Sequence, residues 1–481
     1  MSPRLTILAL SDLHAAESPQ GRGKRGDLAA VLVRKALLRL AHGGIKPDLI
    51  VLLGDTAHES PQNDGTLLSA VYAEAAKAGV PCLSVRGNHD GPGHYDSGLH
   101  AFGGYNFFVF SDDYAKSGKV SRSREQLAAL GAAGKKTPLI ALQHCPVFPD
   151  IASAYPYLPK NAADVRTAYE NAGVVLSLSG HYHKGQRCAK HNGVTYHTVR
   201  ALYETPFCFS VVELTGRRVK ITEHELKNPV AGIADSHSHT QFAYCATTVT
   251  AEKSIDLARE LGVARQYLTE HTFQLYFDKP EGMSFAWKHD PAIPERVWRT
   301  PGRCRMEAYR AWARRLRSDF VRIGLEADML DDGRLLLAPE DADGWDVIVG
   351  ALHEVTGRDS SKTQRQAETL FLKDMERIVQ TPINILAHPF RFFRRKKYDH
   401  PVHLYKPVVK ILAGTGIAAE INFHTYNPDP EFVRLCLEHG VKISLGSDAH
   451  DLAECGEFWP HLRVLEQAGL RPRDFAQHIF H

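Results

Sequence analysis

The sequence predicts an α/β protein built from two domains. Short apolar runs alternate with amphipathic segments, as strands and helices do in layered α/β folds. The alternation is interrupted near Asn228 and Pro229 and resumes beyond them. Residue types that bind metal ions follow the apolar runs in both halves. With 481 residues, each half can bury a core of its own, and we expect domains at residues 1–228 and 229–481.

The composition is that of an ordinary globular protein, with 43% apolar and 23% charged residues. The formal net charge of +3 is too small to predict a nucleic-acid partner by itself. No apolar run approaches the roughly 20 residues of a membrane span, and the eight cysteines show no CxxC spacing. We therefore expect a reduced, cytoplasmic protein that does not enter a membrane.

The first half predicts a sheet of buried strands. Five apolar runs are expected to form them: residues 5–10, 48–53, 81–85, 138–143 and 174–179. The amphipathic segments 27–42 and 66–79 predict helices between the strands. Residues 193–227 carry strand patterns alone, which is typical of a sheet that finishes in antiparallel hairpins.

Residues that can bind metal ions stand just past each of these five runs, in the segments SDLH, GD, GNHD, QH and GHYH. Because ligands of an α/β sheet gather beyond the carboxyl ends of its strands, five separate loops can meet at one point. Carboxylate, imidazole and amide donors without thiolate suit Mn²⁺, Fe or Zn²⁺. The candidate ligands are Asp12, His14, Asp55, Asn88, His144, His181 and His183.

These motifs stand in order across residues 9–183, and the first half resembles the calcineurin-like metallophosphoesterases. The resemblance implies a four-layer α/β/β/α sandwich and a phosphoester hydrolase with two metal ions. Asp55 would bridge the two ions. The first ion would be held by Asp12, His14 and His183, and the second by Asn88, His144 and His181.

His89, next to Asn88, resembles the family's proton donor to the leaving group. A diester expels an alkoxide that needs protonation, and general-acid catalysis typically contributes about 10²–10⁴-fold in rate. His89 and the bridging Asp55 are therefore expected catalytic residues, and phosphodiesters are the favoured substrate class. His58 is expected to be a solvated loop residue, and Cys145 to pack beside a ligand.

The second half begins its candidate site at DSHSHT, residues 235–240. His237 and His239 alternate by two, so on a strand they share one face and can hold one metal ion. Further candidates follow strand-like runs spread over the domain, as in a barrel whose loops converge on one mouth. The irregular stretch 277–304 is expected to be an insertion over this site. The candidate ligands are His237, His239, His271, Glu326, His353, His388, Asp448 and His450.

The second half resembles the PHP family, named for polymerase and histidinol phosphatase, over residues 233–452. The resemblance implies a distorted (β/α)7-type barrel, bridging by Glu326 and phosphate removal from monoesters. This sequence departs from the family in two places, with Glu270 in place of an Asp and Cys245 where many members place another ligand. Cys245 either binds a metal ion as thiolate, which would favour Zn²⁺, or packs. Glu420 either is a structural acid or faces the site.

Two basic clusters bear on the substrate. In the cluster at 391–397, RFFRRKK, Arg391 and Arg394 are placed to bind a phosphate in a bidentate manner, and Arg391 is the third expected catalytic residue. A solvated charge run is the alternative. The segment 298–322, rich in Arg and Trp, either stacks a base or forms a helix packed by its Trp residues.

Two hydrolase sites on one chain suggest successive reactions. The leading hypothesis is a nucleotide-type phosphoesterase whose first site opens a diester, either linear or cyclic, and whose second site removes the phosphate. We expect two metal ions in the first site and two to three in the second, with Mn²⁺ ahead of Fe or Zn²⁺. A DNA or RNA nuclease, and a non-catalytic binding module in one half, are the alternatives. The substrate, the native metal and the oligomeric state stay open.

Overall fold

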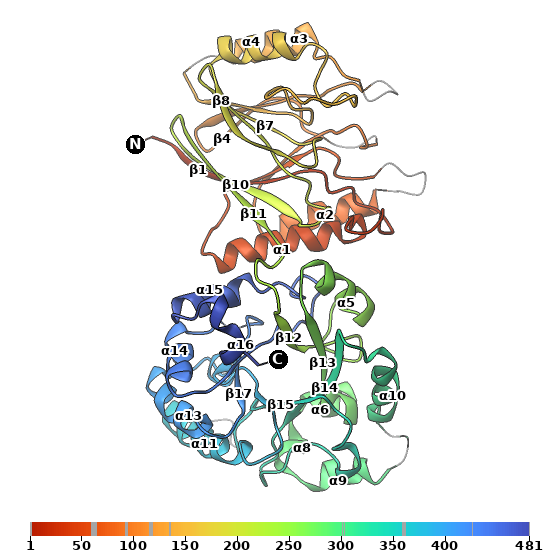
Figure 1. The fold of residues 1–481 in the computed structure, drawn as a ribbon, viewed down its shortest axis with the longest axis vertical. Helices are drawn as coiled ribbons and strands as arrows, with labels where there is room; N and C mark the ends of the chain where they lie inside the picture. Colours follow the sequence, from red (N-terminus) through yellow and green to blue (C-terminus); the bar gives the residue numbers. More distant parts are fainter. Residues whose placement is uncertain are drawn as a thin grey trace. The chain divides into compact units, whose positions relative to one another are not determined.

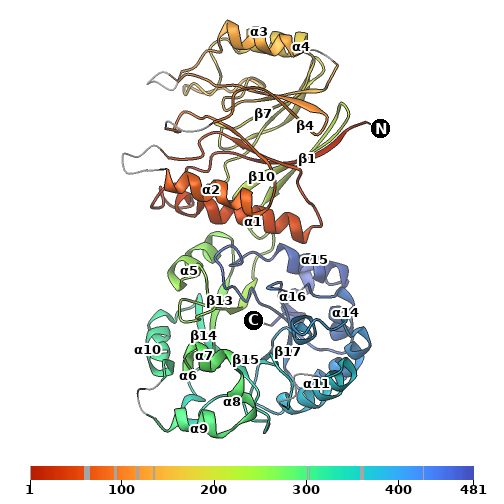
Figure 2. The same cartoon turned by 180° about the vertical axis from the view of Figure 1, so that it is seen from behind.

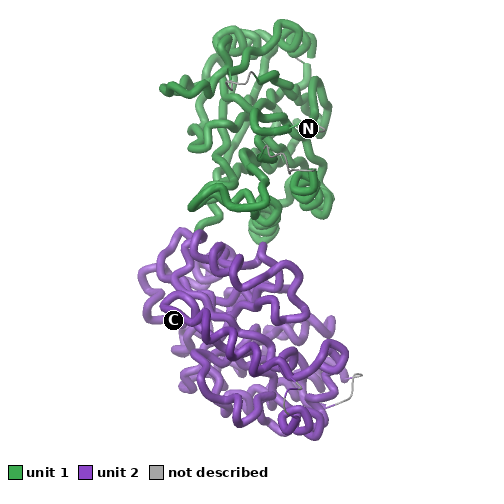
Figure 3. Tube along the Cα trace, turned by 90° about the vertical axis from the view of Figure 1, so that its right-hand side faces the viewer, with its two compact units in different colours: residues 1–227 green, residues 228–481 purple. Residues whose placement is uncertain are grey.

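The computed structural model describes residues 2–58, 65–91, 95–114, 119–133, 136–300, 302, 304–357, 362–425 and 427–480. The chain divides into two compact units, Met1–Lys227 and Asn228–His481 (Figure 3). We call them unit 1 and unit 2. Within the described residues, no helix is both long and apolar enough to cross a membrane.

Unit 1 contains two β-sheets. The first has the strand order β11-β10-β1-β2-β3 and the second the order β4-β5-β6-β7-β9-β8. The strands of the first sheet are β1 (Arg4–Leu10), β2 (Leu49–Leu53), β3 (Cys82–Val85), β10 (Cys208–Thr215) and β11 (Arg218–Glu225). Those of the second are β4 (Gly98–Phe102), β5 (Tyr105–Val109), β6 (Leu139–Leu142), β7 (Val174–Ser179), β8 (Gln186–His191) and β9 (Val194–Thr198).

Helices cover the outer faces of the two sheets, so that unit 1 has the predicted four layers (Figure 1, Figure 2). The helices α1 (Ala29–His42) and α2 (Thr66–Lys77) lie along one sheet. The helices α3 (Arg124–Ala132) and α4 (Ala162–Ala172) lie along the other. This arrangement confirms the α/β/β/α sandwich.

A continuous apolar core fills the space between the two sheets. Alternate residues of each strand enter it, as Leu5, Ile7 and Ala9 do on β1. The opposite face of the second sheet, with Phe108 on β5, packs in a separate cluster with residues of α3 and α4. Both sheets are therefore buried on two faces in their centres, which is why their strands read as continuous apolar runs.

All five strands predicted in the first half form close to their predicted bounds. The parallel part of the first sheet ends in the antiparallel pair β10 and β11, as the strand-only pattern indicated. The hairpin of β4 and β5 was missed. The reason is that β4 is partly exposed and carries no continuous apolar run.

Unit 2 is built on seven parallel strands that pair in sequence order. They are β12 (Ala234–Ser238), β13 (Arg265–His271), β14 (Val321–Asp328), β15 (Val347–Ala351), β16 (Ile385–Leu386), β17 (Ala418–Ile421) and β18 (Ile443–Leu445). A parallel bridge between Ser238 and Ala449 joins the end of β12 to the loop after β18. The sheet thus curls almost into a closed ring, which confirms the distorted (β/α)7-type barrel.

Helices surround this ring (Figure 1). They are α5 (Ala251–Glu260), α6 (Thr272–Tyr276), α7 (Lys279–Met283), α8 (Ala286–His289), α9 (Ala292–Trp298), α10 (Met306–Leu316), α11 (Gln364–Ile378), α12 (Arg391–Arg395), α13 (Tyr405–Leu412), α14 (Pro430–Glu438), α15 (Trp459–Gln467) and α16 (Phe475–His478). The predicted insertion 277–304 forms short helices between β13 and β14, and its residues 301 and 303 lie outside the described residues.

A buried guanidinium ties the second sheet of unit 1 to its helices. Arg122 is 2% exposed, and its Nε and Nη2 atoms each lie 3.3 Å from an oxygen of Asp112. Its Nη1 atom donates to the Tyr169 hydroxyl at 2.7 Å, and its Nη2 atom donates to the carbonyl of Cys145. Because Cys145 follows His144 directly, this network also supports the loop that carries a candidate ligand.

Replacing Arg122 with Met leaves Asp112 buried without its cation. We expect Arg122→Met to lower the free energy of unfolding of unit 1 by about 3–5 kcal/mol, measured by urea titration with far-UV circular dichroism. All five tryptophans lie in unit 2, between residues 287 and 459, so the tryptophan fluorescence transition should not move. Lys220→Met, at an exposed pair with Glu213, is the control and should change stability by less than about 1 kcal/mol. Equal effects of the two substitutions would contradict this account.

Candidate metal centres

Seven side chains of unit 1 converge from the loops that follow β1, β2, β3, β6 and β7, where the sequence predicted them. Two groups bring their ligand atoms within 4.8 Å of one another: Asp12, His14 and His183, and Asp55, His144 and His181. Asp55 Oδ2 lies 3.7 Å from His14 Nε2 and 3.3 Å from His144 Nε2. The oxygen Oδ1 of Asn88 lies 3.2 Å from His144 Nε2. Asp55 therefore lies between the two groups, and we call the seven residues the first centre.

The backbone is strained at many of the predicted ligands. Among the described residues, eleven non-glycine residues have a positive φ, and six of these are predicted ligands of the two units: Asp12, His14, Asp55, His181, His388 and Asp448. Such conformations cost on the order of 1–3 kcal/mol each and cluster at functional sites. Gly54 (φ +88°) also allows a close approach, because a Cβ there would lie 2.4 Å from His144 Nδ1. The fold thus gives up backbone stability to place these side chains.

Hydrogen bonds orient the imidazoles of the first centre. His144 Nδ1 lies 2.7 Å from the carbonyl of Leu53, to which it can donate, and this leaves Nε2 facing Asp55. His183 Nδ1 lies 2.8 Å from Glu204 Oε1. A carboxylate or carbonyl behind a ligand histidine fixes its tautomer and raises its basicity. Sequence analysis missed Glu204, because it stands in no motif and follows no predicted strand end.

The donor set of the first centre fits divalent cations. The buried atoms Asp12 Oδ1 and His181 Nε2 have no hydrogen-bond partner among the described residues. Burial lowers the pKa of His14 to about 4 and the pKa of His181 to about 3, so both imidazoles are neutral, as metal binding requires. Burial alone would raise the pKa of Asp55, but His144 beside it holds that pKa well below its usual range. Burial alone would lower the pKa of His144 and of His183, but neighbouring carboxylates raise these values to about 9 and about 10, so both imidazoles would release a proton on binding a metal ion.

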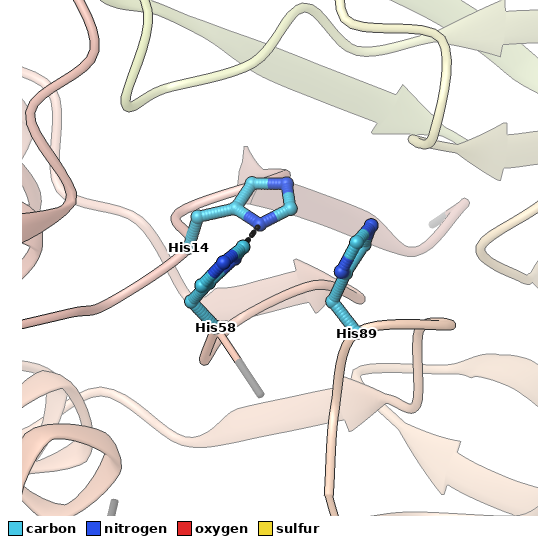
Figure 4. A group of neighbouring side chains, drawn as sticks. All are labelled: His14, His58 and His89. Carbon is cyan, nitrogen blue, oxygen red and sulfur yellow. Dashed lines mark hydrogen bonds between the residues drawn. The ribbon is translucent and has the colours of Figure 1, made fainter. Parts of the chain in front are cut away.

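Three histidines stand side by side at the edge of the first centre (Figure 4). His58 Nδ1 lies 3.4 Å from His14 Nδ1. The rings of His58 and His89 are stacked with centroids 5.5 Å apart, and the ring of His89 lies 5.1 Å from that of His14. His58 was expected to be a solvated loop residue, but it is half-buried against the centre. His58 stands three residues after Asp55 on the same loop, and this position could have indicated that its side chain faces the first centre.

The first centre opens into a cavity of about 420 Å³. One side of this cavity carries candidate ligands and His89, and another carries Tyr155, Tyr157 and Tyr182. The rings of Tyr155 and Tyr157 lie 4.8 Å apart, and Tyr155 is 44% exposed. We call these three residues the tyrosine wall. The cavity therefore contains both candidate ligands and a cluster of tyrosine rings that are tilted relative to one another.

Eight side chains of unit 2 converge at the mouth of the barrel, where the sequence predicted them, and we call them the second centre. Glu326, at 0% exposure, lies in their middle. Imidazole nitrogens within 3.6 Å of its two oxygens belong to His237, His239, His271, His353 and His388. Asp448 Oδ1 lies 2.9 Å from His239 Nε2, and His450 Nε2 lies 3.4 Å from His271 Nε2.

The second centre also fits divalent cations. His237 Nε2, His271 Nδ1 and Glu326 Oε2 are buried and lie close together, yet none has a hydrogen-bond partner among the described residues. Burial lowers the pKa of His388 to about 4. Burial alone would raise the pKa of Glu326, but the surrounding imidazoles, His271 first, hold it well below its usual range. Electron-donating atoms thus converge around Glu326, where a divalent cation would satisfy them.

Buried carboxylates orient the histidines of the second centre. Glu420 Oε1 lies 2.8 Å from His237 Nδ1, and Asp328 Oδ2 lies 2.9 Å from His353 Nδ1. Glu420, for which sequence analysis left two roles open, therefore faces the site from behind a candidate ligand. Glu270 Oε2 lies 3.5 Å from His239 Nδ1, so the lengthened side chain still reaches a candidate ligand.

Cys245 and Arg391 line the pocket of the second centre, a cavity of about 360 Å³. Gln274 Nε2 donates to Cys245 Sγ at 3.0 Å, and burial raises the pKa of the Cys245 thiol to about 12. The thiol is therefore protonated, and its role as a ligand stays a prediction. Arg391 Nη1 lies 2.5 Å from Asp448 Oδ2, and its Nη2 donates to Asn422. This buried guanidinium positions Asp448. A substrate phosphate that binds Arg391, as predicted, would therefore compete with Asp448 for the guanidinium.

Comparisons with known proteins agree with this geometry. Residues 5–185 match the family model of calcineurin-like phosphoesterases, and residues 235–424 match that of the PHP domain. A probable histidinol-phosphatase of Deinococcus radiodurans is 26% identical over 250 residues, which cover 47% of this chain and 90% of that protein. A probable phosphatase of Clostridium novyi is 25% identical over 235 residues, which cover 47% of this chain and 82% of that protein. A dimetal phosphatase structure from Danio rerio covers 47% of this chain and 97% of that protein at 18% identity, with a TM-score of 0.39.

The fold and the two centres define a metal-dependent hydrolase of phosphoric ester bonds. The chain consists of a calcineurin-like phosphoesterase domain followed by a PHP domain.

Each centre should bind its ions independently. We expect Asp55→Asn to lose the metal of the first centre alone and Glu326→Gln to lose that of the second alone, because each carboxylate lies in the middle of one donor set. Mass spectrometry of the metal content, after loading with Mn²⁺ and gel filtration, measures both losses. Full metal content in either variant, or loss from both centres in one variant, would contradict the assignment.

Proposed function

We propose that unit 1 hydrolyses a nucleotide-type phosphodiester, either linear or cyclic, and that unit 2 removes phosphate from the resulting monoester. Two metal ions serve the first centre and two to three the second, with Mn²⁺ preferred over Fe and Zn²⁺. The observation that carries this proposal is the presence of two separate donor sets, each open to a cavity of its own. When bound, such ions activate water and offset charge on the phosphate oxygens.

The residues of the first cavity suit a diester. His89 lines the cavity beside Asn88 and is placed to give a proton to the departing alkoxide. His58, stacked on His89, holds that ring against the centre. Tyr155 of the tyrosine wall is 44% exposed, so its ring can stack on an aromatic group such as a nucleobase, which supports a nucleotide-type substrate.

The residues of the second cavity suit a monoester. Arg394 and Arg395 line it and are exposed, and no carboxylate among the described residues pairs with either guanidinium. A phosphomonoester carries about one and a half to two negative charges near neutral pH, and guanidinium groups bind such a phosphate well. The matched relatives named as probable phosphatases point in the same direction.

A nuclease is less well supported. Two arginines of the Arg-rich segment of unit 2 are held in ion pairs, since Arg310 pairs with Asp341 and Arg317 pairs with Asp346. Trp312 packs against Phe242, with ring centroids 4.9 Å apart. These contacts favour a structural helix over a surface that tracks a nucleic-acid backbone.

Successive action predicts separable defects. With a small nucleotide diester and Mn²⁺, we expect wild type to release inorganic phosphate and Asp55→Asn to leave the diester intact. Asp448→Asn should cleave the diester and accumulate the monoester. ³¹P NMR follows all three species in one sample. If Asp448→Asn also stopped diester cleavage, or if Asp55→Asn stopped the hydrolysis of added monoester, the proposed division between the units would be wrong.

The role of His89 depends on the leaving group. We expect His89→Asn to slow the cleavage of a diester with an alkoxide leaving group by about 10²–10⁴-fold, because that oxygen needs a proton. A 4-nitrophenyl diester needs none, so its cleavage should slow far less. The control is His191→Asn at an exposed position on β8. Equal slowing for both substrates would exclude His89 as the proton donor.

A further inference from the structure

The cavity of unit 2 has an apolar side that the hydrolytic chemistry leaves unused. Phe273, Met283 and Phe285 form this side, and we call them the aromatic ledge. Phe273 is buried, with its ring centroid 5.0 Å from that of the candidate ligand His271. Met283 is 49% exposed, and Phe285 is half-buried. The ledge therefore runs from the second centre outward to the solvent.

Phe285 is held at the ledge in a strained conformation. Its φ of 54° and ψ of 12° lie in the left-handed region, which bulky side chains rarely adopt. Its ring packs 5.3 Å from that of Trp287, which is fully buried, and 5.6 Å from that of Phe273. Asn or Gly would fit this backbone with less strain. An outlier of this kind beside a candidate active site indicates a functional constraint.

A cation completes the ledge. The guanidinium of Arg395 lies 5.5 Å from the centroid of the Phe285 ring. Its neighbour Lys396 is paired with Glu354 at 2.7 Å, whereas no carboxylate among the described residues pairs with Arg395. Arg395 is thus available to a ligand that lies on the ledge. Flat aromatic groups take up such a position, because one face stacks on a ring and the π system attracts a cation.

We propose that the aromatic ledge and Arg395 form a subsite for an aromatic, nucleobase-like group, so that unit 2 selects phosphomonoesters that carry such a group. This inference rests on the proposed monoesterase activity of unit 2. The ledge and the candidate ligands His271, His353 and His450 line one cavity, so a single molecule reaches both. Its volume of about 360 Å³ is that of a small-molecule site. The tyrosine wall is a second, separate set of aromatic side chains, and it lines the cavity of unit 1.

The test compares two substrates with the same leaving oxygen. A nucleoside 5′-monophosphate and ribose 5-phosphate differ in the base alone, so the ratio of their kcat/KM values measures recognition of the base. Asp55→Asn is used as background so that unit 1 is silent. We expect a ratio of about tenfold or more in favour of the nucleotide. Phe285→Asn should bring the ratio towards one and leave ribose 5-phosphate hydrolysis nearly unchanged, whereas Arg395→Gln should lower the ratio and slow both substrates, because Arg395 also faces the phosphate.

The controls distinguish a loss of base recognition from a general loss of folding. Lys397 is exposed, outside the cavity lining, and also has a positive φ, of 59°, so Lys397→Asn is matched in backbone conformation and should keep the full ratio. Because Asn suits a positive φ, Phe285→Asn should keep the far-UV circular dichroism spectrum of its background and unfold cooperatively. A ratio near one in the background protein, or one that Phe285→Asn leaves unchanged, would overturn the subsite.

A binding measurement distinguishes failure of the subsite from failure of the proposed activity. If neither monoester is hydrolysed, the monoesterase assignment of unit 2 is wrong. Adenosine, which has no phosphate, is then titrated calorimetrically into the Asp55→Asn protein with Tyr155→Ala added to weaken the tyrosine wall. The subsite predicts binding that Phe285→Asn weakens about tenfold. Absent binding, or binding that the substitution does not change, would contradict it.

Discussion

The structure depends on one constraint, the convergence of buried imidazoles and carboxylates at one point in each unit. In unit 2, five imidazoles face the two oxygens of Glu326. In unit 1, Asp55 lies between two groups of donors. Carboxylates and imidazoles buried in this way destabilise a fold unless a cation joins them. Metal binding is therefore part of the stability of each unit as well as of its chemistry.

Two different folds meet this constraint by the same route. The two sheets of the sandwich in unit 1 direct the carboxyl ends of their parallel strands to one edge, and so does the ring of parallel strands in unit 2. The loops reach the required geometry through strained backbone, as the positive φ of Asp12, Asp55, His388 and Asp448 shows. Behind the ligands, buried acceptors such as Glu204 and Glu420 fix the imidazole orientation. Each centre thus has an inner set of donors and an outer set that orients them.

Sequence reasoning reached the fold class and the inner donors because both have local signatures. Apolar runs mark the buried strands, and short polar motifs follow them directly, so position along the chain predicts position in space. The residues that orient the ligands were not predicted from the sequence. Glu204, for example, contacts His183 but lies in a loop that carries no motif. Sequence reasoning also could not foresee that Arg391 pairs with Asp448, or that the His58 side chain turns inward. These features depend on side-chain direction in loops, which periodicity does not encode.

The pockets add selectivity to this common chemistry. Each places aromatic side chains beside its donor set, Tyr155 and Tyr157 in one and Phe273 and Phe285 in the other.

Anomalous diffraction from crystals grown with Mn²⁺ tests the central claim most directly, because it locates the ions. The account predicts two separate clusters, one beside Asp55 and one beside Glu326. A map with ions in one unit alone, or with none within ligand distance of these carboxylates, would contradict it.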